Sequence, residues 1–333
     1  KSNQDSLERN LRIGFDLGGT KMLAGVCDSE FSIIGKKRKG TKGHHGMKAG
    51  VARVCEVIRE AIEDAEVTLD RVTEIGIAVP GPLDLDKGIV LDTPNIGWKK
   101  VPLRRMLEDE FELPVFLMND VDAGVYGEYR FGAAKKARCV IGLFPGTGIG
   151  GGCVRDGEIV RGGAFSCFEV GHMRVQPEGP LCGCGRRGCL EAIAGRIPIA
   201  AAAASAAIRG HAPWLRENVG TDIAEIKSGA IRNSITNGDK FVEQIVRTAA
   251  RVIGQATGSL VNILNPDVIL LGGGLVEALP KLYLEEVLAG AREQAMGPFR
   301  DTFKVVVSEL EDNAAVKGAA AWAEYCVSEG RKS

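Results

Sequence analysis

Four side chains that could bind a metal ion lie close together near the middle of the chain. The set spans 18 residues and consists of His172, Cys182, Cys184 and Cys189. Glycines separate the thiols and allow the tight turns that a tetrahedral site requires. Because protein groups would fill all four coordination positions, we expect a structural zinc ion here. The alternative is a set of free thiols beside a core histidine.

Two carboxylates flank this cluster. Glu169 precedes the histidine, and Glu191 follows the last cysteine. A loop that a metal holds rigid is a good platform for carboxylates that bind the hydroxyl groups of a neutral polyol, since such hydrogen bonds need a fixed acceptor. The alternative is that either side chain simply faces solvent.

Two glycine-rich turns could bind phosphate through backbone N–H groups. In the first, Asp16 precedes Gly18, Gly19, Thr20 and Lys21, and its carboxylate could hold a magnesium ion through water. The order Gly-Thr-Lys differs from the Gly-Lys-Ser/Thr of a Walker loop, and a strand pattern follows instead of a helix. An ordinary hairpin turn is the alternative.

The second turn contains Gly146, Thr147 and Gly148. The run 146–151 matches the pattern G-x-G-x-x-G, but that pattern indicates a dinucleotide site only before a helix. Because a hairpin pattern follows here, we exclude a dinucleotide-binding fold and expect a second phosphate-binding turn.

Asp120 is a candidate general base. It follows Asn119 and the apolar run 114–118, and the carboxyl end of a central strand at a domain junction suits that role. The alternative is a cap for a helix over 121–129.

Three further glycines end a later strand. Gly272, Gly273 and Gly274 follow the apolar run 268–271. Bare backbone would let a flat ring or a ribose lie against this segment, and plain close packing is the alternative.

The elements that position these residues repeat once along the chain. Segments 13–30 and 141–158 align at an offset of 128 residues, and each contains two apolar runs joined by a glycine-rich turn. This is the pattern of a β-hairpin. It predicts a duplicated architecture with one hairpin at the start of each half.

Apolar spacing predicts the other elements. We expect helices over 48–67, 199–208, 239–264 and 313–325, and buried strands over 74–79, 114–118 and 268–271. Alternating strands and helices indicate an α/β fold with mostly parallel central sheets. We expect one domain from 12–121 plus 313–333 and a second from 122–312, with the ligand in the cleft between them.

The composition limits the class of protein. A chain of 333 residues suits two domains. The 42 basic and 43 acidic residues give a net charge of −1, which argues against partners such as nucleic acid or a membrane surface. Six of the nine cysteines are scattered singly, which is typical of a reducing compartment, so we expect a cytoplasmic protein.

Eight motifs together resemble the ROK family (repressors, open reading frames and sugar kinases). In chain order they are DLGGTK at 16–21, VPGPLD at 79–84, TPNIGW at 93–98, ND at 119–120, GTGIGGG at 146–152, EVGHM at 169–173, CGCGRRGCLEAIAG at 182–195 and NPDVILLGGGL at 265–275. The cysteine-rich motif is specific to that family, whereas DLGGT marks the wider actin-like ATPase superfamily. The resemblance implies two actin-like (ribonuclease H-like) α/β domains, with ATP, Mg²⁺ and a sugar in the cleft and a last helix packed on the first domain.

The resemblance also implies roles for individual residues. Asp120 would take the proton from the sugar hydroxyl, and His172 would be both a zinc ligand and a sugar contact. The other sugar contacts would be Gly81, Asn95, Asn119, Glu169 and Glu191. The turns at 18–20 and 146–148 would bind phosphate, and 272–274 would contact adenosine.

Two positions depart from the family pattern. Asp122 stands where the family has Asn, and a second carboxylate would raise the pKa of Asp120 if the two lie close. Phe168 stands where the family has small residues, often Gly, and would reshape the sugar pocket.

We therefore expect an ATP-dependent hexose kinase, first of all a glucokinase, that forms a homodimer as the family habitually does. Fructose, mannose, N-acetylglucosamine and N-acetylmannosamine are alternative substrates. A sugar-responsive transcriptional regulator is a further alternative, although the 12 residues before Ile13 are few for a DNA-binding domain. We also expect loss of zinc to weaken sugar binding more than ATP binding.

Overall fold

A computed structural model describes residues 10–41, 46–93, 96–163 and 166–331. The chain divides into two compact units. The first unit consists of Lys1–Lys136, Glu158–Cys167 and Glu309–Ser333, and the second consists of Ala137–Gly157 and Phe168–Ser308.

A five-stranded sheet forms the centre of the first unit, in the order β3-β2-β1-β4-β8. Its strands are β1 (Leu11–Leu17), β2 (Lys21–Cys27), β3 (Ile33–Gly40), β4 (Val72–Val79) and β8 (Val115–Asn119). The first three are antiparallel neighbours, whereas β4 runs parallel to both β1 and β8. Strands β1, β4 and β8 therefore end at the same edge of the sheet.

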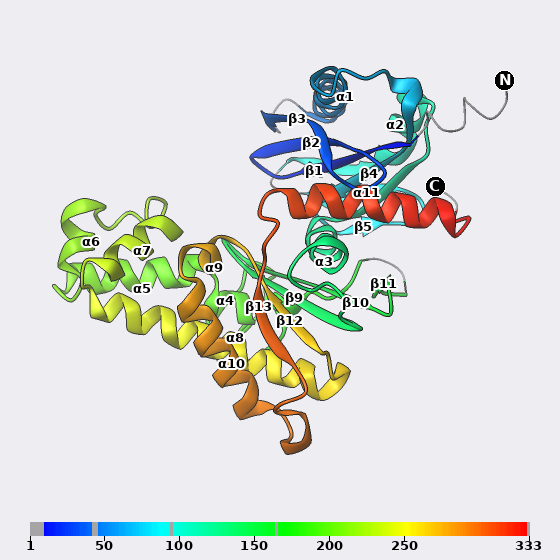
Figure 1. The fold of residues 1–333 in the computed structure, drawn as a ribbon. Helices are drawn as coiled ribbons and strands as arrows, with labels where there is room; N and C mark the ends of the chain where they lie inside the picture. Colours follow the sequence, from blue (N-terminus) through cyan, green and yellow to red (C-terminus); the bar gives the residue numbers. More distant parts are fainter. Residues whose placement is uncertain (1–9, 42–45, 94–95, 164–165, 332–333) are drawn as a thin grey trace. The chain divides into compact units, whose positions relative to one another are not determined.

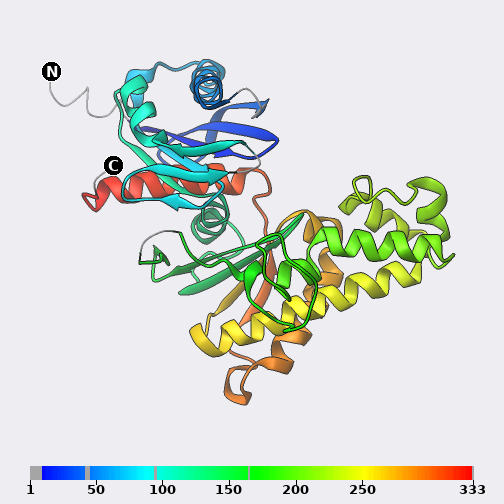
Figure 2. The ribbon, with the colours of Figure 1, turned by 180° about the vertical axis from the view of Figure 1, so that it is seen from behind.

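Helices cover both faces of this sheet (Figures 1 and 2). α1 (Gly46–Asp64) contacts β2 and β3, and α11 (Asn313–Ser328) contacts β1 and β4. A methyl group added to Gly14 would lie only 1.9 Å from the carbonyl oxygen of Val316, so glycine is needed for this close approach of strand and helix. The last helix thus packs on the first unit, as the resemblance implied.

Shorter elements complete the first unit. They are η3 (Leu69–Arg71), β5 (Leu83–Asp84), β6 (Ile89–Thr93), β7 (Trp98–Val101), α2 (Leu103–Phe111), α3 (Asp120–Phe131) and β11 (Glu158–Ile159). Strands β5, β6 and β7 form a separate antiparallel sheet. α3 follows β8 without a loop and packs along α11, which fixes the first residue of α3 at the edge of the main sheet.

The second unit repeats the strand arrangement of the first. β9 (Cys139–Pro145) and β10 (Ile149–Arg155) form an antiparallel hairpin, and β12 (Val268–Leu271) runs parallel to both β9 and β13 (Lys304–Val307). The order β10-β9-β12-β13 corresponds to β2-β1-β4-β8. The duplication predicted from the two hairpin patterns is confirmed.

Helices make up most of the rest of the second unit. They are η4 (Val170–His172), α4 (Leu190–Ala194), α5 (Arg196–Ile208), α6 (Pro213–Asn218), α7 (Ser228–Thr236), α8 (Lys240–Leu264), α9 (Gly274–Ala278), α10 (Pro280–Gln294) and η5 (Gly297–Phe299). The long helices α8 and α10 pack along each other. α8 ends at Asn265, which has a left-handed φ of 44°, directly before Pro266. The predicted helices and strands are all present, with small changes at their ends.

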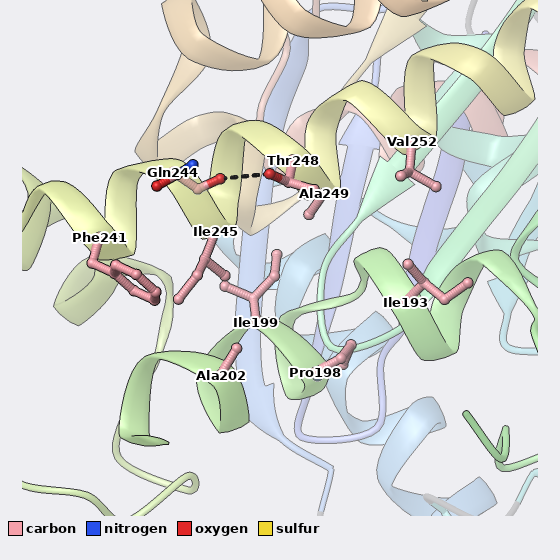
Figure 3. Close-up of a pocket in the computed structure, with 10 residues that line it drawn as sticks. All are labelled: Ile193, Pro198, Ile199, Ala202, Phe241, Gln244, Ile245, Thr248, Ala249 and Val252. Carbon is pink, nitrogen blue, oxygen red and sulfur yellow. Dashed lines mark hydrogen bonds between the residues drawn. The ribbon is translucent and has the colours of Figure 1, made fainter. Parts of the chain in front are cut away.

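One segment of the described chain, Leu190–Ile208, is long and apolar enough to resemble a membrane span, and 44% of it is buried. In the structure it is two helices, α4 and α5, separated at Gly195. α5 packs against α8, and a mainly apolar groove of about 380 Å³ lies between them, lined by Ile199, Phe241 and Ile245 among others (Figure 3). Such a composition is typical of a core helix in a globular domain. The groove contains none of the candidate site residues.

Candidate active site

The carboxyl ends of β1 and β8 bring two aspartates of the first unit together. Asp16 lies near the end of β1, and Asp120 is the first residue of α3. Through the sheet, Asp16 pairs with Ala78, and Ala78 pairs with Met118, two residues before Asp120. The topology, rather than proximity in sequence, creates this pair.

Asp16 titrates near neutral pH. Burial and, to a smaller extent, the negative charge of Asp120 raise the pKa of Asp16, and Lys21 partly offsets both effects, so that the pKa is about 7. A nearby cation favours the ionised form of such a group. The pair is therefore a suitable place for a divalent cation that accompanies phosphate groups.

Asn119 orients the start of α3. Its side-chain oxygen accepts hydrogen bonds from the backbone N–H groups of Val121 (2.9 Å) and Asp122 (3.3 Å), so Asn119 is the N-cap. Asp120 also accepts from Val121, at 2.9 Å. The helix cap that was the alternative role for Asp120 is thus mainly Asn119. Because the side-chain oxygen of Asn119 forms the cap, its amide nitrogen can bind another partner.

The amide nitrogen of Asn119 faces Gly81. A methyl group added to Gly81 would lie 3.2 Å from that nitrogen. Two residues that the resemblance assigned to the sugar are therefore neighbours in the first unit. A third, Asn95, lies outside the described residues.

The turn between β1 and β2 is held by groups that the sequence did not indicate. The hydroxyl of Thr41 donates to the carbonyl oxygen of Gly18 at 2.6 Å. Lys21 and Arg38 both form ion pairs with Asp312, at 2.8 and 2.5 Å. Because Asp312 is 291 residues from Lys21, no local pattern could have predicted this contact.

In the second unit, the four predicted metal ligands come together. One ligand atom from each of His172, Cys182, Cys184 and Cys189 lies within 4.8 Å of every other. Nδ1 of His172 is 3.6 Å from the sulfur of Cys182, and the sulfurs of Cys184 and Cys189 are 3.7 Å apart. A tetrahedral zinc site with metal–sulfur bonds of about 2.3 Å has edges of about 3.8 Å. The four residues therefore fit a zinc ion. None of the nine cysteines forms a disulfide bond.

The thiols of this cluster differ in acidity. The backbone N–H of Arg186 lowers the pKa of Cys184, which favours the thiolate that binds metals. Burial and the two neighbouring thiols raise the pKa of Cys189 to about 11. A bound cation would remove this penalty by stabilising all three thiolates.

Backbone contacts shape the loop that carries the cysteines. The N–H of Cys182 donates to the carbonyl oxygen of Arg186 at 2.7 Å. Gly188 has a φ of +75°, and a methyl group there would lie 1.6 Å from the carbonyl oxygen of Gln176. Glycine is required at this position to close the loop.

Glu191 connects the metal cluster with the second glycine turn. One of its oxygens accepts the N–H of Ile149 at 3.1 Å, and the other lies 3.8 Å from the sulfur of Cys182. A methyl group added to Gly148 would lie 2.2 Å from the first oxygen. The carboxylate thus does not simply face solvent.

The second turn is also held by α5. The N–H of Arg196 donates to the carbonyl oxygen of Gly146 at 2.9 Å, and its guanidinium donates to the hydroxyl of Thr147 at 3.2 Å. Arg196 stands at the start of α5, so the turn is fixed from one side by a helix. Sequence reasoning did not identify Arg196.

The residues before His172 show how the chain accommodates a departure from the family pattern. Phe168 has a φ of 69°, the left-handed conformation that glycine adopts most easily. Its carbonyl oxygen accepts the N–H of Val170 at 2.7 Å. Glu169 is exposed and precedes η4. The backbone thus keeps a conformation suited to glycine although the side chain is aromatic.

Close packing accounts for two of the three glycines after β12. A methyl group on Gly272 would lie 2.5 Å from the ring of Phe144, and one on Gly273 would lie 2.9 Å from the carbonyl oxygen of Pro145. Gly274 is more open, with its nearest contact at 3.5 Å. Close packing therefore explains the glycines at 272 and 273. The contact of this segment with adenosine stays a prediction.

Known proteins resemble this chain over nearly its full length. The ROK family profile matches residues 12–325. A glucokinase of Thermotoga maritima is 33% identical over 315 residues, which cover 92% of this chain and 95% of that enzyme. The crystal structure of a ROK family glucokinase from Streptomyces griseus, in complex with glucose and AMPPNP, aligns with a TM-score of 0.81 and 32% identity and covers 95% and 99% of the two chains. The xylose repressor of Caldicellulosiruptor bescii is 31% identical over 93% of this chain and 77% of its own length.

The two-domain α/β fold expected from the sequence is confirmed.

Proposed function

Because the chain belongs to the ROK family, we propose that it is an ATP-dependent hexose kinase with glucose as its substrate. The observation that carries the proposal is the pair of Asp120 and Asp16 at the ends of two parallel strands. Transfer of a phosphoryl group requires a base near the attacking hydroxyl and a carboxylate near the metal-bound phosphates. This pair supplies both groups.

In this proposal, Asp120 accepts the proton of the primary hydroxyl of glucose as that oxygen attacks the γ-phosphorus of ATP. The bond between the γ-phosphorus and the bridging β-phosphate oxygen breaks, and ADP leaves. Asp16 would hold Mg²⁺, which would supply neutralisation of the phosphate charge. Backbone N–H groups of the turns at 18–20 and 146–148 bind the phosphates, with Lys21 beside the first turn. The segment 272–274 contacts adenosine.

We assign the binding of the sugar to the residues that the family resemblance indicated. They are Gly81, Asn95, Asn119, Asp120, Glu169, His172 and Glu191. The proximity of Asn119 to Gly81 supports the assignment in the first unit. In the second unit, the hydrogen bond between Glu191 and Ile149 supports it, because it holds the carboxylate in one place.

We further propose that His172, Cys182, Cys184 and Cys189 hold a structural zinc ion. The compact arrangement of their four ligand atoms supports this assignment. Since protein groups occupy every coordination position, the ion would order the loop and take no part in the chemistry.

Measurement of ADP release with ATP, Mg²⁺ and each of five sugars tests the proposed function. The sugars are glucose, fructose, mannose, N-acetylglucosamine and N-acetylmannosamine. We expect the highest kcat/KM with glucose. If another sugar gives a higher kcat/KM, that sugar replaces glucose as the proposed substrate. If none of the five sugars leads to ADP release, the proposal that the protein is a kinase is contradicted.

The similarity to a xylose repressor favours a second candidate, a sugar-responsive regulator. A regulator binds its sugar without turnover of ATP, so the same assay separates the two functions. Calorimetric sugar binding together with no ADP release would support the regulator.

We also propose that the enzyme is a cytoplasmic homodimer that supplies phosphorylated sugar to glycolysis. The scattered free cysteines support a reducing compartment. Sedimentation equilibrium tests the assembly, and a mass of twice 35.4 kDa is expected.

A further inference from the structure

A hydroxyl group with no role in the proposed function lies beside two of the proposed sugar contacts. The Oγ atom of Ser166 is buried and has no hydrogen-bond partner among the described residues. A methyl group on Gly81 would lie 3.4 Å from this oxygen and 3.2 Å from the amide nitrogen of Asn119. Gly81 has no side chain, so Ser166 and Asn119 border the same space.

The orientation of Asn119 determines which atom faces this space. Its oxygen accepts two backbone N–H groups at the start of α3, so its amide nitrogen is turned toward Gly81. That nitrogen can only donate, whereas the hydroxyl of Ser166 can donate and accept. Together they match an alcohol group, which also donates and accepts.

A buried hydroxyl without a partner is unfavourable, and native proteins contain few of them. A ligand hydroxyl in the space beside Gly81 would give Ser166 its missing hydrogen bond. The same contact would discriminate against a sugar that lacks that hydroxyl, because the buried group would then stay unpaired.

We propose that Ser166 binds a secondary hydroxyl group of the hexose, together with the amide nitrogen of Asn119. Ser166 thus contributes to specificity among sugars and takes no part in proton transfer. This inference rests on the proposed function, since it names a further contact of the same sugar site.

The test compares wild-type enzyme with Ser166→Ala on glucose and on 2-deoxy-, 3-deoxy- and 4-deoxyglucose. We expect kcat/KM for glucose to fall about 3- to 10-fold, the loss typical of one neutral hydrogen bond. The loss should disappear with one of the three deoxy sugars, because that sugar lacks the partner of Ser166. The KM for ATP should not change.

Thermal unfolding without sugar distinguishes a binding role from a structural one. Since the hydroxyl of Ser166 has no partner in the part of the protein that the structure describes, its removal should leave the Tm unchanged or raise it. Ser328→Ala is the matched control: it removes a serine hydroxyl of the first unit that donates to the carbonyl oxygen of Tyr325 at 2.8 Å, and it should not alter sugar preference.

The inference is overturned if Ser166→Ala loses nothing on glucose, or loses the same factor on all four sugars. A lowered Tm with unchanged sugar preference would also overturn it. Calorimetric binding of the same sugars without ATP repeats the comparison independently of phosphoryl transfer. The hexose kinase proposal and the role of Ser166 can therefore fail separately.

Discussion

The negative charge of Asp120, which directly follows β8, raises the pKa of Asp16 on β1, and β4 lies between these two strands. Burial is the larger cause, and together the two effects bring the pKa of Asp16 to about 7. A positive ion at this position would favour ionised Asp16, which is the state that an enzyme using Mg²⁺ and ATP needs.

Asp120→Asn should abolish most of the turnover and leave sugar binding largely intact. Loss of a positioned general base typically lowers the rate by about 10²- to 10⁴-fold. Steady-state ADP release gives the rate, and calorimetry gives the affinity for glucose. Asp109→Asn, which changes a carboxylate on the exposed side of α2, is the control. Turnover close to that of the wild type would refute the assignment of Asp120 as the base.

Asp16→Asn should remove a pH dependence of stability. The pKa of Asp16 is about 7 in the folded protein against 3.8 for a free carboxyl, so between these values the folded protein retains a proton that the unfolded chain releases. The free energy of unfolding contributed by this group therefore falls as pH rises from about 4 to about 7, by at most about 4 kcal/mol.

Urea unfolding at several pH values, without Mg²⁺ or nucleotide, checks this prediction. Asp16→Asn should be more stable than the wild type at pH 8 and similar at pH 4, whereas its kinase activity should be lost. The same pH profile in the variant and the wild type would mean that Asp16 titrates normally.

The purified protein should contain one zinc ion per chain. Cys184→Ser should lose the metal and lower the Tm by on the order of 5 °C, because the loop would lose its cross-link. Elemental analysis and thermal unfolding measure the two effects. Cys167→Ser is the matched control, since Cys167 belongs to the other unit and its thiol donates to the carbonyl oxygen of Val160 at 3.3 Å. Full zinc content and unchanged Tm in Cys184→Ser would exclude the site.

Glu191 changes one expectation drawn from the sequence. The phosphate turns lie far from the cysteines in sequence, which predicted that loss of zinc would mainly affect the sugar. In the structure, Glu191 contacts both Cys182 and the N–H of Ile149 at the second turn. We now expect zinc depletion to raise the KM for ATP as well as the KM for glucose.

Gly148→Ala and Gly146→Ala separate the two functions of the second turn. A methyl group added to Gly148 would displace the side chain of Glu191. A methyl group added to Gly146 would meet no described atom within 4 Å. Both variants should weaken ATP binding, and only Gly148→Ala should raise the KM for glucose, by about 10- to 100-fold, as for the loss of a charged hydrogen bond. An equal rise in the KM for glucose in both variants would contradict the assignment of Glu191 to the sugar site.

Local sequence determined the elements and the proximity of the candidate metal ligands. The hairpins around 13–30 and 141–158 and the strand 268–271 were predictable because apolar periodicity and turn glycines act over a few residues. The cysteines and His172 were predictable because their spacing is short. The family resemblance added the proposed roles of Asp120 and of the residues assigned to the sugar.

Only the tertiary structure decided which distant groups meet. The pairing of Asp16 with Asp120 depends on β4 lying between their strands, and the contact of Lys21 with Asp312 depends on α11 packing against β1. The contact of Glu191 with Gly148 and the position of the Ser166 hydroxyl beside Gly81 likewise arise from the packing of separate segments. Sequence patterns record the preferences of neighbouring residues, whereas these contacts depend on how whole elements pack, which no short-range pattern encodes.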